Sequence, residues 1–516
     1  MPSISSNQQG GVIRWDKDDW LSGLIPEWGP TEGISSRGFT TMTSVDPHRR
    51  PGYLSPGASP INVTSASSIT GLLTGGDLRG DNAYLVGGNL VHQLNPISNT
   101  ISTTAPYPYP IPAAVGHAAH TTFVAEDCLV YQVGGTEYAF FSYNDNTDGD
   151  VGRITFGSPD VPLANYMSTV PTGAAVLTAG VPHPMIEGDD NVLYIGNGNI
   201  LAGFDGPTTT FIPARLTLPT GFRITSFSKQ PNFLVIFAYK DSSSGSSTFN
   251  FGEAKAFFWD YVSEDPSYIY TLPGNYVNGG FVFQGIVGCF TQGKSGMTTN
   301  PKQSRLCLFN GRVFEGKAQF SQNIPRHGGV EVFDNCVKFN AGGQIYQWGT
   351  THFGLSPIFT NIAAGSGSST GGILKNFYAD NLVASTGTST SGGLQSFSGF
   401  ATGSAYLALA EPTYPRRMQG RVDSVIVRWR RSVTSSDATT SLALILDQGV
   451  TERTVISSLN NLTQNTTEYK FDSSNVALSS TPFYSISPAL IFSSGSTAPP
   501  MPQSIEVHYS NVDINI

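Results

Sequence analysis

The pattern nearest to a chemical motif is a possible phosphate-binding loop, Gly288-Cys-Phe-Thr-Gln-Gly293-Lys294-Ser295. In such a loop the backbone N–H groups hold phosphates, the lysine contacts the β and γ groups, and the serine binds Mg²⁺. The required helix is missing from the pattern, because residues 296–301 are turn formers and leave the anion without a helix dipole. We therefore interpret this match as a glycine-rich turn between strands and predict no cofactor.

Two further groups contain residues that bind metals. Residues 144–150, Asn-Asp-Asn-Thr-Asp-Gly-Asp, resemble the start of a calcium loop, but the twelfth position is Thr155 instead of glutamate. His117 and His120 are three residues apart, and on a strand such side chains point to opposite faces. The first group reads as a polar hairpin tip, and we predict no metal site. Carboxylates for glycoside hydrolysis could still come together from distant strands.

An arginine cluster is the strongest local concentration of charge. If residues 421–430 form a strand, Arg428 and Arg430 share one face with Ile426, while Val425, Val427 and Trp429 take the other. Solvent, an acidic partner subunit or a nucleic-acid backbone could each balance the positive charge. We predict these arginines as subunit-interface candidates: Arg416, Arg417, Arg421, Arg428, Arg430 and Arg431.

Residues 1–34 form a tryptophan-rich arm that contains Trp15, Trp20 and Trp28. Pro26 interrupts its amphipathic pattern, which favours an extended segment over a helix. The aromatic side chains can pack on the chain's own core or on a neighbouring subunit. All three tryptophans are therefore interface candidates as well.

Residues 35–362 repeat one pattern, in which an Asp or Asn turn leads into an apolar strand, a glycine-containing hairpin and a second strand. Copies begin at Asp81, Asp127, Asp190 and Asp334. Gly-Gly and Gly-Asn pairs supply the positive φ angles that two-residue hairpin turns need. Single hairpins cannot bury their own apolar faces, but radially stacked sheets can. The pattern predicts a six- or seven-bladed β-propeller, with a series of β-sandwiches as the alternative.

The sequence changes character after this region. Residues 363–393 are rich in Gly, Ser and Thr and predict a linker and a loop. Residues 394–516 contain alternating apolar and polar stretches, which predict a C-terminal β-sandwich. The predicted fold class is thus all-β throughout.

Composition and charge limit the classes of function that fit this chain. The chain has 516 residues, only 13% charged residues and a formal net charge of -9, which disfavours general binding to nucleic acid. Cys128, Cys289, Cys307 and Cys336 lie in apolar stretches without CxxC spacing, so we predict buried free thiols. The polar N-terminus and the short apolar runs predict no signal peptide and no membrane span.

These features together resemble the propeller-containing tail proteins of tailed bacteriophages, including nozzle-type proteins. The resemblance is carried by Ile13-Arg-Trp-Asp in the arm, the segment Ser44-Val-Asp-Pro-His-Arg-Arg-Pro-Gly-Tyr-Leu-Ser-Pro-Gly57, the hairpins, and the ending Ile505-Glu-Val-His-Tyr. It covers most of the chain and carries over no catalytic residue.

The resemblance implies a structural virion component, not an enzyme, made in the host cytoplasm and located in the tail. Its expected partners are copies of itself in a ring and other tail or connector proteins, around a passage through which phage DNA moves without sequence-specific binding. The alternative is a glycan-binding or glycan-cleaving propeller for host recognition, with Tyr107, Tyr109 and Trp348 as possible sugar platforms.

Overall fold

The structure is a computed structural model of the whole chain. It describes residues 11–16, 39–43, 45–46, 54–55, 57, 59–63, 69, 72–111, 124–144, 149–241, 251–293, 304–320, 322–333, 336–342, 344–349, 358–364, 372–378, 381–385, 393–398, 403–407, 418–429, 440–446, 451–456, 468–472, 482–484, 486–493 and 501–513.

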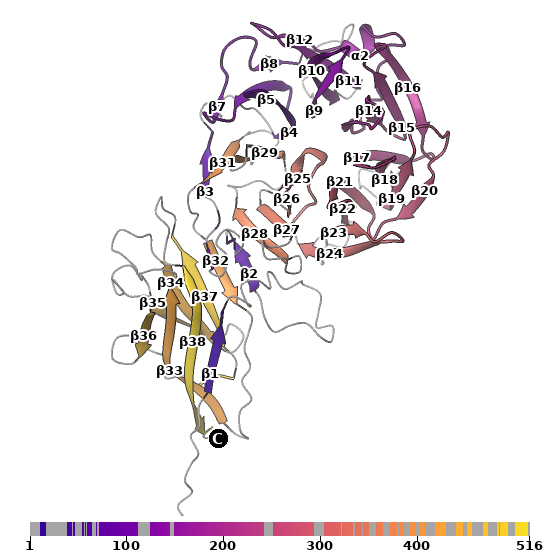
Figure 1. The fold of residues 1–516 in the computed structure, drawn as a ribbon. Coiled ribbons are helices and arrows are strands. Elements are labelled where there is room, and N and C mark those ends of the chain that lie inside the picture. The colour runs from indigo at the N-terminus through magenta and orange to yellow at the C-terminus, as the bar shows by residue number, and fades with distance from the viewer. Residues whose placement is uncertain are drawn as a thin grey trace, which may run out of the picture. The chain divides into compact units, whose positions relative to one another are not determined.

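Seven small sheets follow one another in the described part of the chain, and Figure 1 shows them arranged as a ring. Strand order follows the sequence in six of them, which is the arrangement of an up-and-down propeller sheet. The seventh, β29-β30-β31-β3, takes its last strand from the N-terminal side of the chain. The predicted all-β propeller is therefore confirmed, and its ring is closed by strands distant in sequence.

The strands of these sheets are β4 (Leu73–Arg79), β5 (Asn82–Gly87), β6 (Leu90–Asn95), β7 (Thr100–Ile101) and β8 (Tyr109–Pro110); β9 (Val124–Val133), β10 (Thr136–Asn144), β11 (Gly149–Thr155) and β12 (Val161–Leu163); β13 (Met185–Glu187), β14 (Val192–Asn197), β15 (Ile200–Asp205) and β16 (Thr210–Thr217); β17 (Phe222–Gln230), β18 (Phe233–Asp241), β19 (Phe251–Trp259) and β20 (Tyr268–Thr271); β21 (Tyr276–Phe283), β22 (Ile286–Gln292), β23 (Ser304–Phe309) and β24 (Phe314–Phe320); β25 (Val330–Phe333), β26 (Cys336–Ala341), β27 (Gln344–Gly349) and β28 (Ile358–Ala364); and β29 (Leu374–Tyr378), β30 (Asn381–Ser385), β31 (Leu394–Ser398) and β3 (Ser59–Asn62).

The glycine-containing hairpins lie where the repeat predicts them. Gly88, Gly134, Gly198 and Gly342 all have positive φ and occupy the turns of β5–β6, β9–β10, β14–β15 and β26–β27. Three of these hairpins are the second and third strands of their sheets, whereas β9–β10 are the first and second. This difference in phase explains why the repeat looks degenerate in the sequence.

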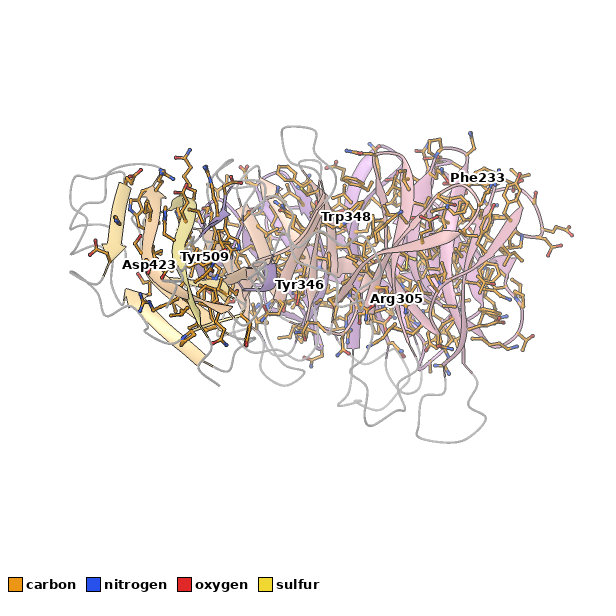
Figure 2. All side chains as sticks on the ribbon, turned by 90° about the horizontal axis from the view of Figure 1, so that it is seen from below. Phe233, Arg305, Tyr346, Trp348, Asp423 and Tyr509 are labelled. Carbon is orange, nitrogen blue, oxygen red and sulfur yellow. The ribbon has the colours of Figure 1, made fainter. Side chains whose placement is uncertain are left out.

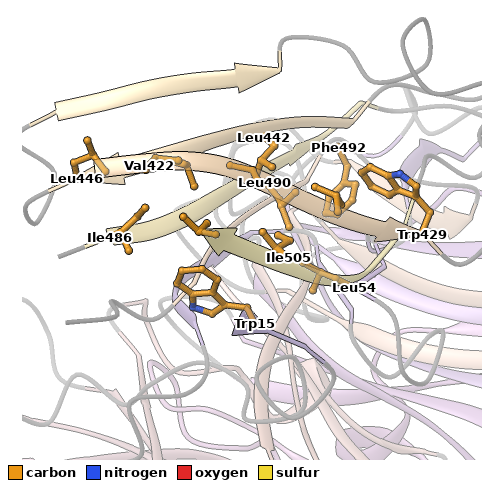
Figure 3. Packing of buried hydrophobic residues seen from close by; sticks show 14 of the residues in the cluster. Trp15, Leu54, Val422, Trp429, Leu442, Leu446, Ile486, Leu490, Phe492 and Ile505 are labelled. Atoms are coloured by element: carbon orange, nitrogen blue, oxygen red, sulfur yellow. The ribbon is translucent and has the colours of Figure 1, made fainter. Parts of the chain in front are cut away.

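Two other sheets share one apolar cluster, shown in Figure 3. Trp15, Val427 and Ile505 come from the four-stranded sheet, and Leu442 and Leu490 come from the five-stranded sheet. The first sheet has the order β1 (Gly11–Trp15), β38 (Pro502–Asp513), β33 (Met418–Trp429) and β36 (Glu468–Asp472). The second has the order β2 (Phe39–Thr43), β32 (Gly403–Leu407), β37 (Ile486–Phe492), β34 (Thr440–Leu446) and β35 (Thr451–Ile456).

The bounds of the compact units differ from the predicted domains. One unit contains residues 1–60, 346–364 and 398–516, and the other contains residues 61–345 and 365–397. The predicted arm contributes β1, which pairs with β38, and β2 pairs with β32. The predicted linker and loop, 363–393, contains β29 and β30. The sequence patterns did not predict the bounds of these units, because strands far apart in sequence complete the same sheets.

The four cysteines are buried free thiols, as predicted. Within the described ranges, helical structure is confined to α2 (Tyr166–Thr169) and the 3₁₀ turn η2 (His327–Gly329). Neither of these short elements is long enough to cross a membrane, and the described chain offers no longer apolar helix.

Candidate functional site

The first strands of the propeller sheets are joined to one another by buried polar side chains. Thr74 on β4 and Thr225 on β17 occupy equivalent positions, each at a register shift against the next strand of its own sheet. The Thr74 hydroxyl donates to the Ala125 carbonyl at 2.6 Å, and the Thr225 hydroxyl donates to the Val277 carbonyl at 2.6 Å. Each bulge thus turns a hydroxyl toward the first strand of the following sheet.

Two aspartates make the same kind of connection through carboxylates. Asp77 Oδ2 accepts the Val130 N–H at 2.8 Å, linking β4 to β9. Asp127 Oδ2 accepts the Met185 N–H at 2.8 Å, linking β9 to β13, and also lies 3.7 Å from His327 Nε2. Burial raises the pKa of Asp127, whereas His327 and the Met185 N–H act to lower it.

His327 belongs to η2 and connects three first strands at once. Its Nδ1 lies 2.7 Å from Ser226 Oγ on β17, and its Nε2 lies 3.1 Å from the Met185 carbonyl on β13. The Gly280 N–H on β21 donates to the same Ser226 oxygen at 2.6 Å. A neutral imidazole with its proton on Nε2 satisfies every contact, because Nε2–H then donates to Met185 and Nδ1 accepts from Ser226.

Ser226, His327 and Asp127 are the residue types of a nucleophilic triad. Ser226 is completely buried, so a substrate carbonyl cannot reach its oxygen. That oxygen already accepts a backbone N–H, and η2 is tightly seated, since a Cβ on Gly328 would stand 2.4 Å from the Thr74 carbonyl. The arrangement therefore serves to hold sheets together and is not built for acyl transfer.

Further charged groups surround this cluster. Glu126, beside Asp127, accepts the backbone N–H of His183, and burial raises the pKa of its carboxyl to about 7. Lys375 Nζ on β29 lies 3.8 Å from Glu331 Oε2 on β25. Carboxylates from different sheets do meet here, as the sequence left open. Their bonds go to backbone and to cations of the same chain, which leaves no free acid–base pair among them.

Sequence analysis did not identify this cluster. Ser226 and His327 are 101 positions apart, and neither lies in a recognisable motif. Asp127 was predicted as the turn that begins one copy of the repeat, but it lies inside β9. The available signal was weak: a polar residue within an otherwise apolar first strand. Its partner could not be deduced without knowing which strands become neighbours.

The arginine cluster is only partly within the described residues. Arg428 on β33 pairs with Glu468 on β36 at 2.7 Å and with Glu506 on β38. Arg14 on β1 lies 3.4 Å from the same Glu506, so four strands carry alternating charges. The charge of Arg428 is therefore balanced within its own sheet, an answer that the sequence interpretation did not consider.

Val425, Val427 and Trp429 are buried while Arg428 is half-exposed, which confirms the predicted faces of this strand. Arg421 is exposed on the same strand. Four of the predicted arginines, Arg416, Arg417, Arg430 and Arg431, lie outside the described residues.

Trp15 is a core residue of this chain, because it is 3% exposed within the cluster of the two-sheet unit. Its ring is thus already covered by the chain itself, which removes it as a free interface residue. Trp20 and Trp28 lie outside the described residues.

The phosphate-loop match requires a correction. Residues 288–292 form most of β22 and pair with both neighbouring strands, so they are not a turn. Lys294 and Ser295 lie outside the described residues. A buried ladder strand has its N–H groups bonded to other strands and cannot cradle phosphates.

The calcium-loop segment sits between β10 and β11, which form the predicted hairpin. The side chain of Asn144 already has hydrogen-bond partners there. Its oxygen accepts the Gly180 N–H at 2.9 Å, and its amide donates to the Val181 carbonyl at 3.0 Å. His117 and His120 lie outside the described residues. Where side chains are described, no three His, Cys, Asp or Glu residues are grouped to hold a metal ion.

The three aromatic residues suggested as sugar platforms contact other residues of the protein. Tyr107 is 4% exposed and its hydroxyl donates to Asp160 at 2.9 Å. Tyr109 packs edge-on against Phe141, with ring centroids 6.5 Å apart. Trp348 on β27, labelled in Figure 2, is also buried. Tyr107 and Trp348 therefore present no open ring face for a sugar, whereas Tyr109 is half-buried.

The chain forms a β-propeller in which buried polar side chains link the first strands of different sheets. It also forms a unit of two sheets that share one apolar cluster. No family model matches the chain, and no curated protein matches it.

Among solved structures it is similar to the Dos1 propeller, at 13% identity and a TM-score of 0.40 over 66% of this chain and 94% of that one. It is similar to the β-propeller domain of the Trilobed protease from Pyrococcus furiosus, at 10% identity and 0.37 over 64% and 96%. It is also similar to an exo-β-1,3-galactanase from Phanerochaete chrysosporium, at 12% identity and 0.32 over 87% and 100%. Similarity this low carries no function to this chain.

Proposed function

We propose that the protein is a structural component of a tailed-phage virion, part of a tail or nozzle assembly, and that it works by assembly and not by catalysis. The observation that supports this proposal is the distribution of polar and apolar side chains between the centre and the outer strands of the propeller. The side chains of Asp77, Asp127, Ser226 and His327 at the propeller centre are bonded within the chain, as described above. Large apolar side chains on outer strands are exposed instead, including Val161 at 61% on β12 and Ile269 at 51% on β20.

Outer strands with exposed apolar side chains are suited to contacts with other subunits. In the proposed role, rigid propellers associate through such edges into a ring around the DNA passage, and other tail or connector proteins bind the ring. An acidic protein repels phosphate, so DNA would pass without adhering. The chain's net charge of -9 has the sign that this role needs.

Electron microscopy of the purified protein tests this proposal. Closed rings, or density in phage tails that fits the propeller, would support it. Separate particles at every concentration, together with glycan binding by the same preparation, would contradict it and favour the alternative of a glycan-recognising propeller.

A further inference from the structure

The propeller ring is closed by a contact between its first sheet and its last, and we call this contact the closing joint. Apolar side chains of β5, β6 and β7 form one buried cluster there with those of β29, β30 and β31. The Ile373 N–H donates to the Leu73 carbonyl at 2.9 Å, and Figure 1 shows the two sheets as neighbours in the ring. Unlike the other joints, this one connects sheets that are not consecutive in the sequence.

The joint is closely packed. A Cβ atom at Gly76 on β4 would stand 2.5 Å from Leu85 Cδ2 and 2.7 Å from Ile373 Cδ1. Side chains of both sheets therefore meet over this glycine.

His92 on β6 faces the closing joint. It lies directly opposite Leu85 on β5, so the two side chains share one face of the sheet. Leu94, two residues further along the strand, belongs to the cluster of the joint, whereas Val91 belongs to the cluster on the opposite face. His92 is completely buried. Alternation along the strand thus directs its imidazole ring into apolar surroundings.

Neither ring nitrogen of His92 has a hydrogen-bond partner, and among the described histidines this is true of His92 alone. His183 is also completely buried, but its Nδ1 lies 2.9 Å from the Gly196 carbonyl. An unpaired N–H in apolar surroundings lowers stability, and a charged imidazole would lower it far more. The closing joint therefore accepts this residue only in its neutral form.

No charged group compensates His92. The charged side chains on β4 and β29 have partners outside the joint: Asp77 bonds to Val130, Arg79 to Glu137 and Lys375 to Glu331. Tyr84 on β5 belongs to the cluster on the opposite face. The sequences of β7, β30, β31 and residues 63–72 contain no charged residue. Burial alone therefore lowers the pKa of His92, from 6.5 to about 4.

We propose that His92 is an acid-sensitive switch of the propeller, and that its protonation separates the last sheet from the first at the closing joint. Opening admits water to the ring, so the charged form is favoured in the open state. The closed joint is fully stabilised above pH 6.5 and loses this stabilisation as the pH falls toward 4. This inference goes beyond the proposed function and does not depend on it.

The measurement has to be local, because Glu126 responds to pH in the opposite direction and would mask the switch in the overall stability. Hydrogen exchange followed by mass spectrometry, corrected for the intrinsic exchange rate, compares the protein at pH 8 and pH 5. The opening constant of peptides from β4–β7 and β29–β31 should rise about 30-fold, given pKa values of 6.5 and about 4 in the open and closed joint. Peptides from residues 192–241, which belong to other joints, should not show this rise.

Two variants remove the titrating group. In His92→Gln and His92→Phe the closing joint should be equally protected at both pH values, because neither side chain takes up a proton. His92→Gln keeps a polar side chain, so it separates titration from polarity and also carries the test if His92→Phe does not fold. Circular dichroism at pH 8 verifies that each variant is folded.

His183→Asn is the matched control. It removes an equally buried histidine outside the closing joint and keeps an N–H donor for the Gly196 carbonyl. The 30-fold response of the closing joint should persist in this variant.

A pH response of folded His92→Gln equal to that of the wild type would overturn the switch. Equal protection of the wild-type joint at pH 8 and pH 5 would overturn it too, as would a loss of protection of the same size in every sheet, since that is general acid unfolding. A histidine-labelled NMR titration, with the His92 signal assigned by its absence from His92→Gln, should give a pKa near 4, and a value near 6.5 would contradict the inference.

Electron microscopy at pH 8 tests the proposed function separately. Its failure to show assembly would leave the switch intact, and an overturned switch would leave the proposed assembly intact.

Discussion

The centre of the propeller and the outer face of the sheet β1-β38-β33-β36 use charged residues in opposite ways. At the centre, Asp127 is buried and bonds to the backbone of the next sheet as well as to His327. On the sheet face, Arg428 and Glu468 bond to each other with side chains 35% and 54% exposed. When the partner of a buried polar group is removed, the group stays unsatisfied and the protein loses its desolvation free energy as well as the contact. The energy of an exposed ion pair is small because water screens it.

The comparison shows that the same residue types have different structural roles in the two regions. The central groups decide which strands become neighbours, because each satisfies a specific N–H or carbonyl of the following sheet. The surface pairs add weak attraction between strands whose pairing the backbone ladder and the apolar core already determine. Mutations in the two regions should therefore differ in size and in dependence on pH.

Asp127→Ala is expected to have the largest effect. It leaves the Met185 N–H without an acceptor and removes the partner of His327, so the free energy of unfolding should fall by about 4 kcal/mol. Asp127→Asn keeps one acceptor oxygen and should lose about half as much. Urea denaturation measures both, and equal, small losses would show that the central cluster is no more important than the surface pairs.

The pH dependence of stability should come next in size. Burial raises the pKa of Glu126 from 4.5 to about 7, so folding favours the protonated carboxyl. This stabilisation is complete below pH 4.5 and is lost as the pH rises toward 7.

Relative to Glu126→Gln, the wild type should thus lose about 2 kcal/mol of unfolding free energy between pH 4.5 and 7. The difference between the two proteins isolates Glu126 from Asp127, whose pKa is also raised by burial. Parallel stability curves for the two proteins would contradict the assignment.

The two bulge threonines should show intermediate effects. Thr74→Val and Thr225→Val each remove the donor to a carbonyl of the next sheet, and each should cost about 1.5 kcal/mol. Thr→Ser at the same positions keeps the hydroxyl and serves as the control. Thermal unfolding compares the four variants, and equal losses for Val and Ser would assign the effect to packing.

The Arg428–Glu468 pair should contribute least. A double-mutant cycle with Arg428→Ala and Glu468→Ala should give a coupling energy of about 0.5 kcal/mol, decreasing with added salt. A coupling energy as large as the effect of Asp127→Ala would remove the distinction between the two regions.

Much of the local structure could be predicted from the sequence. Glycine pairs marked the hairpin turns, since few other residues adopt positive φ there, and apolar stretches marked the strands between them. Alternation assigned Val427 to the buried face of β33 and Arg428 to the other face. The burial of the four cysteines followed from their apolar neighbours.

Long-range pairing could not be predicted. β1 and β2 complete sheets whose other strands come from the C-terminal third of the chain, and β3 completes the last propeller sheet. The compact units have other bounds than the predicted arm, linker and domains for this reason. The central cluster was missed for the same reason, since Asp127, Ser226 and His327 belong to separate parts of the sequence.

The sequence by itself determined the strands, their turns and the faces they bury, because steric limits on φ and the alternation of side chains act over a few residues. Only the tertiary structure decided which strands are neighbours, which charges find partners and which aromatic rings remain at the surface. These outcomes depend on closing the ring and burying apolar faces together, and contacts between sheets exist only once that has happened.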